Sequence, residues 1–196
     1  MNKAKRKILW FVAASSLLAS TVCSAQNGFT TPEGKPYDVT IPMEVTGFDK
    51  AVAAEHGYEI LADEQGIQYS AKIGATRRGA AEEAVAPANR IGGNCGYSWL
   101  YYDAIGHSAA QINTGFQLKW PAVSYYWKVN LRDAGGSSSQ TWGGGLFFRS
   151  RWGTSKEVTH MTHGHSEARV SKASSVILSN GAVCTSGGPW DSTNVY

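Results

Sequence analysis

Two consecutive segments alternate between apolar and polar side chains, and this alternation restricts the possible folds more than any other feature. Between residues 110 and 120, apolar side chains and threonine occupy every second position and polar side chains occupy most of the others. After Pro121, residues 123–131 repeat the pattern. A period of two is typical of a β-strand with one buried face, and two such runs in succession favour adjacent antiparallel strands.

Shorter strand-like runs surround these two segments. Turn residues separate them, and helical patterns are few. A series of about seven short strands predicts a mainly β fold, either an antiparallel β-sandwich or a small barrel. The expected strands are residues 97–103, 110–120, 123–131, 140–151, 155–161, 166–171 and 175–179.

The first 25 residues have the features of a secretory signal peptide. A basic start precedes an apolar stretch of about 15 residues, shorter than the ~20 that span a bilayer, and small residues lead to a cleavage site after Ala25. We therefore expect a secreted, extracellular protein without a membrane span. Four of the 18 basic residues and none of the 15 acidic ones lie in this segment, so the remaining chain has a net charge of −1. This charge argues against nucleic acid as a partner.

Composition divides the remaining chain into three parts. Residues 26–73 predict a small α+β segment, with a helix followed by a hairpin, which could serve as a pro-region. Residues 74–93 are rich in Ala, Gly, Arg and Glu and contain no aromatic residue, as is typical of a linker. Residues 94–196 hold every tryptophan outside the first 25 residues and predict the antiparallel β-domain.

Two cysteines, Cys95 and Cys184, remain once residues 1–25 are removed. In an oxidising compartment two such thiols are expected to form a disulfide. The bridge would close a loop of about 90 residues within the β-domain and stabilise it by restricting the unfolded chain. A paired cysteine cannot act as a nucleophile, so we predict no cysteine chemistry.

Aromatic and amide side chains on the polar faces of the strands predict a ligand-binding surface. We expect the rings of Tyr102 and Tyr126 to point away from the faces that carry Trp99 and Trp127. Exposed rings with amide groups beside them suit the binding of a glycan or of another protein. The amide side chains expected on this surface are Gln111, Asn113 and Asn130. Packing of the same rings in cross-strand pairs is the structural alternative.

Three histidines, His160, His163 and His165, lie within six residues of one another. Imidazole is a common ligand of zinc and copper, and three of them could hold a catalytic metal with an open position. The alternative is a polar, solvated loop between two strands. We therefore predict no cofactor, with a zinc or copper site at these histidines as the exception to test.

No segment matches an established catalytic motif. The run from Cys184 to Pro189 resembles the nucleophile loop of trypsin-like serine proteases, and Arg90 to Gly93 resembles their activation site. In that family an aspartate precedes the nucleophile, whereas Thr185 precedes Ser186 here. We interpret this serine as part of a glycine-rich turn and predict no catalytic residue.

These observations lead to three expectations about function. The first is a secreted, non-enzymatic protein that recognises an extracellular glycan or protein through an aromatic and amide-rich sheet face. The second is a pro-protein whose N-terminal segment masks a toxin-like or inhibitory β-domain until cleavage near Arg78 or Arg90. The third is a metal-dependent enzyme at the histidine cluster.

Overall fold

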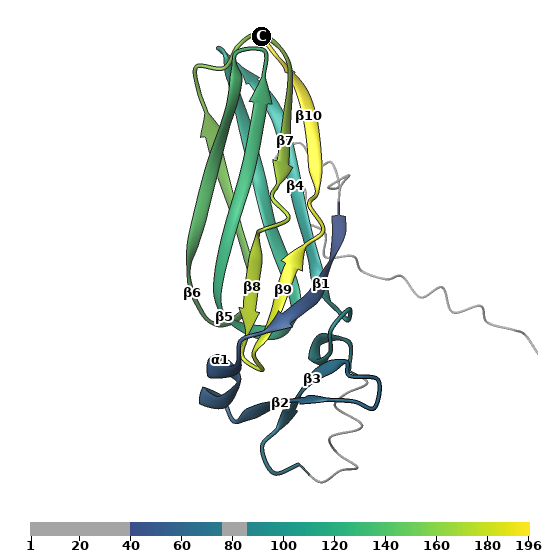
Figure 1. Ribbon diagram of the computed structural model, residues 1–196. Helices are drawn as coiled ribbons and strands as arrows, with labels where there is room; N and C mark the ends of the chain where they lie inside the picture. The colour runs from purple at the N-terminus through teal and green to yellow at the C-terminus, as the bar shows by residue number, and fades with distance from the viewer. Residues whose placement is uncertain (1–39, 76–85) are drawn as a thin grey trace, which may run out of the picture.

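The computed structural model describes residues 40–75 and 86–196, and antiparallel β-strands dominate both ranges (Figure 1). The elements in chain order are β1 (Thr40–Phe48), α1 (Lys50–Glu55), β2 (Tyr58–Ala62), β3 (Gln68–Lys72), η1 (Pro87–Asn89), β4 (Asn94–Gly106), β5 (Ala109–Asp133), β6 (Gly136–Val158), β7 (Gly164–Val170), β8 (Ser175–Leu178), β9 (Ala182–Ser186) and β10 (Trp190–Val195). The predicted mainly β, antiparallel fold is confirmed.

Five of the strands close into a small barrel. Starting from β5, neighbouring strands pair in the order β4, β1, β9 and β8, and β8 pairs with β5 again. Three further strands extend the barrel: β6 pairs with β5, and β7 pairs with β5 on one side and β10 on the other. The result is elongated, with the C-terminus at the end opposite α1, β2 and β3 (Figure 1).

The strand β5 closes the barrel because it bends in the middle. We call residues 109–118 its first arm and residues 122–133 its second arm; its pairing with β6 is irregular between Gln117 and Ala122, the stretch that contains Pro121. The first arm pairs with β4, and the second pairs with β7 and β8. The expected alternation is confirmed in both arms. The expectation that they are adjacent strands is wrong, because they share β6 as a partner instead of pairing with each other.

The core lies between the inner faces of the two arms. The ring centroids of Phe116, on the first arm, and Trp127, on the second, are 5.2 Å apart, and both side chains are fully buried. Two tryptophans from the two halves of β6 complete this cluster, with the ring centroids of Trp142 and Trp152 6.0 Å apart. The bend in the β5–β6 ribbon thus brings its apolar faces together.

The predicted helix and hairpin near the N-terminus are both present. Asp49 caps α1 by accepting hydrogen bonds from the backbone N–H groups of Ala51 and Val52. The strands β2 and β3 form the hairpin, and the hydroxyl of Ser70 donates to the carbonyl of Asn180 at 2.6 Å. The small α+β unit is therefore fastened to the end of the barrel.

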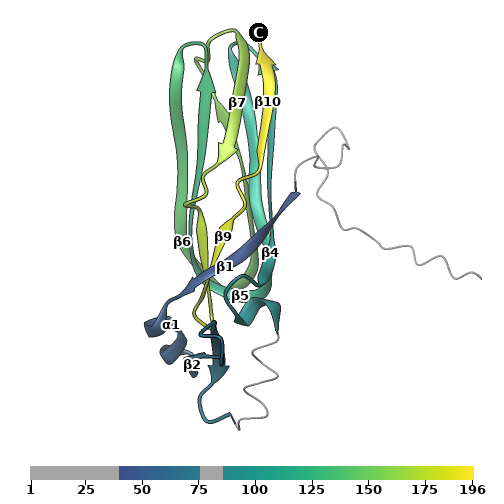
Figure 2. The ribbon, with the colours of Figure 1, turned by 45° about the vertical axis from the view of Figure 1, so that its right-hand side comes forward.

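The strand β1 was not predicted, and it belongs to the barrel although it precedes residue 94. It lies between β4 and β9 in the barrel and buries Met43 and Val45 completely or almost so (Figure 2). The predicted β-domain, residues 94–196, therefore does not contain the whole barrel. Alternation along β1 is weak because Gly47 and Pro42 interrupt it. Neither β9 nor β10 is among the expected strands, and both are short.

The predicted disulfide between Cys95 and Cys184 is confirmed, with 6.2 Å between the two Cα atoms. Cys95 belongs to β4 and Cys184 to β9, the two neighbours of β1. The bridge thus joins the two strands between which the N-terminal strand lies.

Candidate functional site

The residues predicted to form one ligand surface lie on different sides of the barrel. Gln111 and Asn113 belong to the first arm of β5, and Tyr126 and Asn130 to the second. The inner faces of the two arms meet in the core, so their outer faces point in opposite directions. Tyr126 is 45% exposed and points outward as predicted. The amides of the first arm and the side chains of the second do not share a surface.

Tyr102 is buried, and its predicted outward orientation is wrong. It pairs with Ile112 of the first arm, which places both on the inner face. Its hydroxyl lies 2.8 Å from the hydroxyl of Ser166 and donates to the sulfur of Met161 at 3.2 Å. Burial raises the pKa of Tyr102, although the hydrogen bond to Ser166 opposes that effect. This tyrosine is a core residue.

Trp99 is the reason why the sequence did not show which face of β4 lies in the core. It lies on the outer face of the strand, opposite Gly115, and yet it is only 4% exposed. The Cζ2 atom of its indole lies 2.5 Å from the position that a Cβ atom would take at Gly115 and 3.2 Å from the corresponding position at Gly153. Two glycines on neighbouring strands therefore make room for a tryptophan outside the barrel.

A different part of the sheet presents exposed polar and aromatic side chains together. Asn130 on β5 pairs with Arg169 on β7, which in turn pairs with Trp190 on β10. In the next row, Arg132 pairs with Glu167. All five side chains are exposed and point outward from three adjacent strands. We call these residues the outer platform: Asn130, Arg132, Glu167, Arg169 and Trp190.

Trp190 is the most prominent member of the outer platform. Its side chain is 48% exposed, and the guanidinium carbon of Arg169 lies 5.8 Å from the centre of its ring, within the range of a cation–π contact. All five platform residues line an open pocket of about 380 Å³. Of the platform residues, only Asn130 was predicted to bind a ligand. Trp190 was not predicted to do so, because β10 is too short to show a clear alternation.

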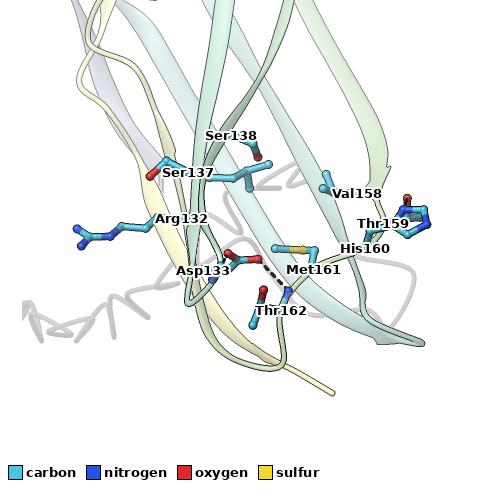
Figure 3. Close-up of a pocket in the computed structure, with 12 residues that line it drawn as sticks. Arg132, Asp133, Ser137, Ser138, Val158, Thr159, His160, Met161 and Thr162 are labelled. Atoms are coloured by element: carbon cyan, nitrogen blue, oxygen red, sulfur yellow. Dashed lines mark hydrogen bonds between the residues drawn. The ribbon is translucent and has the colours of Figure 1, made fainter.

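The end of the barrel near the C-terminus carries a second hollow, between the β5–β6 turn and the loop that follows β6 (Figure 3). Asp133 holds this end together: its two carboxylate oxygens accept hydrogen bonds from the N–H groups of Gly135 at 2.8 Å and Thr162 at 3.0 Å. Met161 lies between Asp133 and His160 in Figure 3. Both carboxylate oxygens of Asp133 therefore already accept hydrogen bonds from backbone N–H groups.

The three histidines near this end contact different partners. The Nε2 atom of His163 is 2.8 Å from the hydroxyl of Ser108, and Nδ1 of His160 is 3.0 Å from the hydroxyl of Thr159. His165 lies on β7, 3.4 Å from a carboxylate oxygen of Glu167. Within residues 40–75 and 86–196, no three His, Cys, Asp or Glu side chains are arranged to hold a metal ion.

Of the predicted processing positions, only Arg90 lies in the described residues; Ala25 and Arg78 fall outside them. Arg90 directly follows η1 and forms an isolated bridge with Tyr69 of the hairpin. Its guanidinium is 3.6 Å from the carboxylate of Asp63. These contacts fasten the predicted linker to the hairpin at this position.

Two findings concern the chain as a whole. None of the helices in the described ranges has the length and apolar character needed to cross a membrane. No known protein family, curated protein or solved structure matches this chain.

Proposed function

We propose that this protein is a secreted, non-enzymatic recognition protein that binds an extracellular glycan through the outer platform. The observation that carries the proposal is the exposed ring of Trp190 beside Arg169 and Asn130 on adjacent strands. An exposed aromatic ring offers an apolar surface to the face of a sugar, and amide and guanidinium groups offer hydrogen bonds to its oxygens.

The charges of the outer platform favour an acidic glycan. The platform contains two guanidinium groups, from Arg132 and Arg169, and one carboxylate, from Glu167. Guanidinium groups bind carboxylates with two parallel hydrogen bonds, which suits the carboxylate of a uronic acid. A glycan that carries carboxylates is therefore the expected ligand.

Two further features support a site of action outside the cell. The first 25 residues have the organisation of a secretory signal peptide. The disulfide between Cys95 and Cys184 is typical of proteins in oxidising compartments.

Substitution of the exposed tryptophan tests the proposal. We expect Trp190→Ala to weaken binding to an immobilised uronic-acid polysaccharide by about tenfold or more, because a central aromatic contact is removed. Tyr126→Ala is the matched control: its ring is 45% exposed and lies on the same sheet, beside β8 instead of β7. It should bind like the wild type, and a neutral polysaccharide should bind less tightly than the acidic one.

Two results would contradict the proposal. One is a wild-type protein that no polysaccharide in the panel retains. The other is an unchanged affinity of Trp190→Ala, with the melting temperature confirming that the variant is folded.

A further inference from the structure

Two phenylalanines stand out from the barrel at the bend of β6, at the end of the molecule near α1. Phe147 is 87% exposed and Phe148 is 57% exposed, whereas the preceding Leu146 is only 4% exposed and packs into the core. Phe148 meets the ring of His56, just after α1, at a centroid distance of 5.3 Å. The leucine anchors the bend, and the two aromatic rings face outward. We call Phe147 and Phe148 the aromatic tip.

The backbone of the aromatic tip has a conformation that phenylalanine disfavours. The φ angles are 48° at Phe147 and 63° at Phe148, both in the left-handed region where a bulky residue is an outlier. Asparagine or glycine would adopt this conformation more easily. Two consecutive phenylalanines therefore occupy positions where neither backbone preference nor burial favours them, which points to a role for their exposed rings.

Basic side chains lie near the aromatic tip on β6 and on the neighbouring segment of β5. Arg149 and Arg151 follow it on β6, and both are exposed. Residues 118–121 of β5 lie opposite Ser150, so the exposed Lys119 comes to the same end of the barrel. Segments 117–122 and 143–151 contain no acidic residue. On the side of α1, Glu55 directly precedes His56 and carries a negative charge. The same helix also carries the positive charge of Lys50.

We propose that the aromatic tip inserts into the interface of an anionic lipid membrane. Phenylalanine partitions into the boundary between headgroups and acyl chains, and basic side chains near the surface are attracted to anionic lipids. This end of the barrel combines both properties, since the exposed Phe147 and Phe148 directly precede Arg149 on β6, and the adjacent strand carries Lys119. This contact would hold the protein at a membrane surface without a membrane-spanning helix. It involves no residue of the outer platform.

The test compares the full chain with the variant Phe147→Asn/Phe148→Asn by co-sedimentation with lipid vesicles. Vesicles contain phosphatidylcholine alone or an equal mixture with phosphatidylglycerol. We expect the wild type to bind the anionic vesicles more tightly than the neutral ones. The variant should lose about tenfold or more of this affinity. Residues 1–39 are the same in both proteins, so the difference between them reports on the tip.

The asparagine substitutions also separate membrane binding from folding. Because asparagine suits a left-handed backbone, the double variant should melt at the same temperature as the wild type or higher, while losing membrane affinity. Tyr126→Asn, which removes another exposed ring from the sheet, should keep full affinity. If the double variant melts at a lower temperature, the single variant Phe147→Asn replaces it in the vesicle-binding test. Phe147 is suited to this because it is 87% exposed.

Three results would overturn the inference. The wild type could fail to bind anionic vesicles, the folded tip variant could bind them as tightly as the wild type, or Tyr126→Asn could lose as much affinity as the tip variant. Retention of polysaccharide should be the same for the wild type and the tip variant, so this test is independent of the glycan proposal.

Discussion

Among single residues, Gly115 has the clearest structural requirement. It pairs with Trp99 on β4 and with Gly153 on β6, and all three lie on the outer face of the barrel. A Cβ atom at this position would collide with the carbonyl oxygen of Trp152 and with the indole of Trp99. The backbone of Trp152 belongs to a paired strand and cannot move away easily. The absence of a side chain at Gly115 therefore leaves room for the indole of Trp99.

We predict that Gly115→Ala lowers the free energy of unfolding by about 1–3 kcal/mol, the usual range for overpacking a tight site. The control is Gly47→Ala on β1, because a Cβ there meets no other described atom within 4 Å. Chemical denaturation of both variants measures the difference. Equal stability of the two variants would show that Trp99 and its neighbours can rearrange at little cost.

Among the strands, β1 determines how the N-terminal segment is attached to the barrel. Its first half pairs with β4 and its second half with β9, and it contributes Met43 and Val45 to the core. The hypothesis of a pro-segment that masks the β-domain would require this strand to leave after cleavage. Its departure would break two sets of backbone hydrogen bonds and expose core side chains. Cleavage alone would not achieve this.

We therefore predict that cleavage after Arg90 leaves the two fragments associated. They should elute together from a size-exclusion column in native buffer and separate only in denaturant, because β1 remains paired within the barrel. The disulfide cannot hold them together covalently, since both of its cysteines follow Arg90. Release of a folded fragment 91–196 in native buffer would instead favour the pro-protein hypothesis.

For the molecule as a whole, the disulfide is the longest-range covalent constraint. Cys95 and Cys184 are 89 residues apart in sequence, and both side chains are completely buried. The loop between them includes β5, β6, β7 and β8. In the unfolded chain a link of this length removes a large amount of conformational entropy.

We predict that Cys95→Ala/Cys184→Ala lowers the free energy of unfolding by about 4.5 kcal/mol, according to the chain-entropy relation for this loop length. Alanine avoids placing an unsatisfied hydroxyl at either buried position. Denaturation of the variant, and of the wild type with and without a reducing agent, measures the effect. The reduced wild type should resemble the variant. A difference of less than about 1 kcal/mol from the oxidised protein would contradict the prediction.

Tyr102 and Asn130 show how much of the candidate site could be predicted from the sequence. Both were expected on an outer face, and only Asn130 is there. In β5 the polar side chains mark the outer face, so the orientation of Asn130 could be inferred. In β4 aromatic side chains occupy both faces, and the partner strand decides that Tyr102 lies beside Ile112 in the core. No comparable alternation indicates from the sequence that Trp190 is exposed, because β10 is short.

Local sequence patterns were enough to predict the mainly β character of the chain, the inner faces of both arms of β5 and the disulfide. These properties depend on local periodicity or on the number of available cysteines. The place of β1 in the barrel became apparent only from the pairing of the folded strands, and so did the proximity of Asn130, Arg169 and Trp190 on three adjacent strands. Such proximity depends on the register between strands far apart in sequence, which alternation within a single strand does not encode.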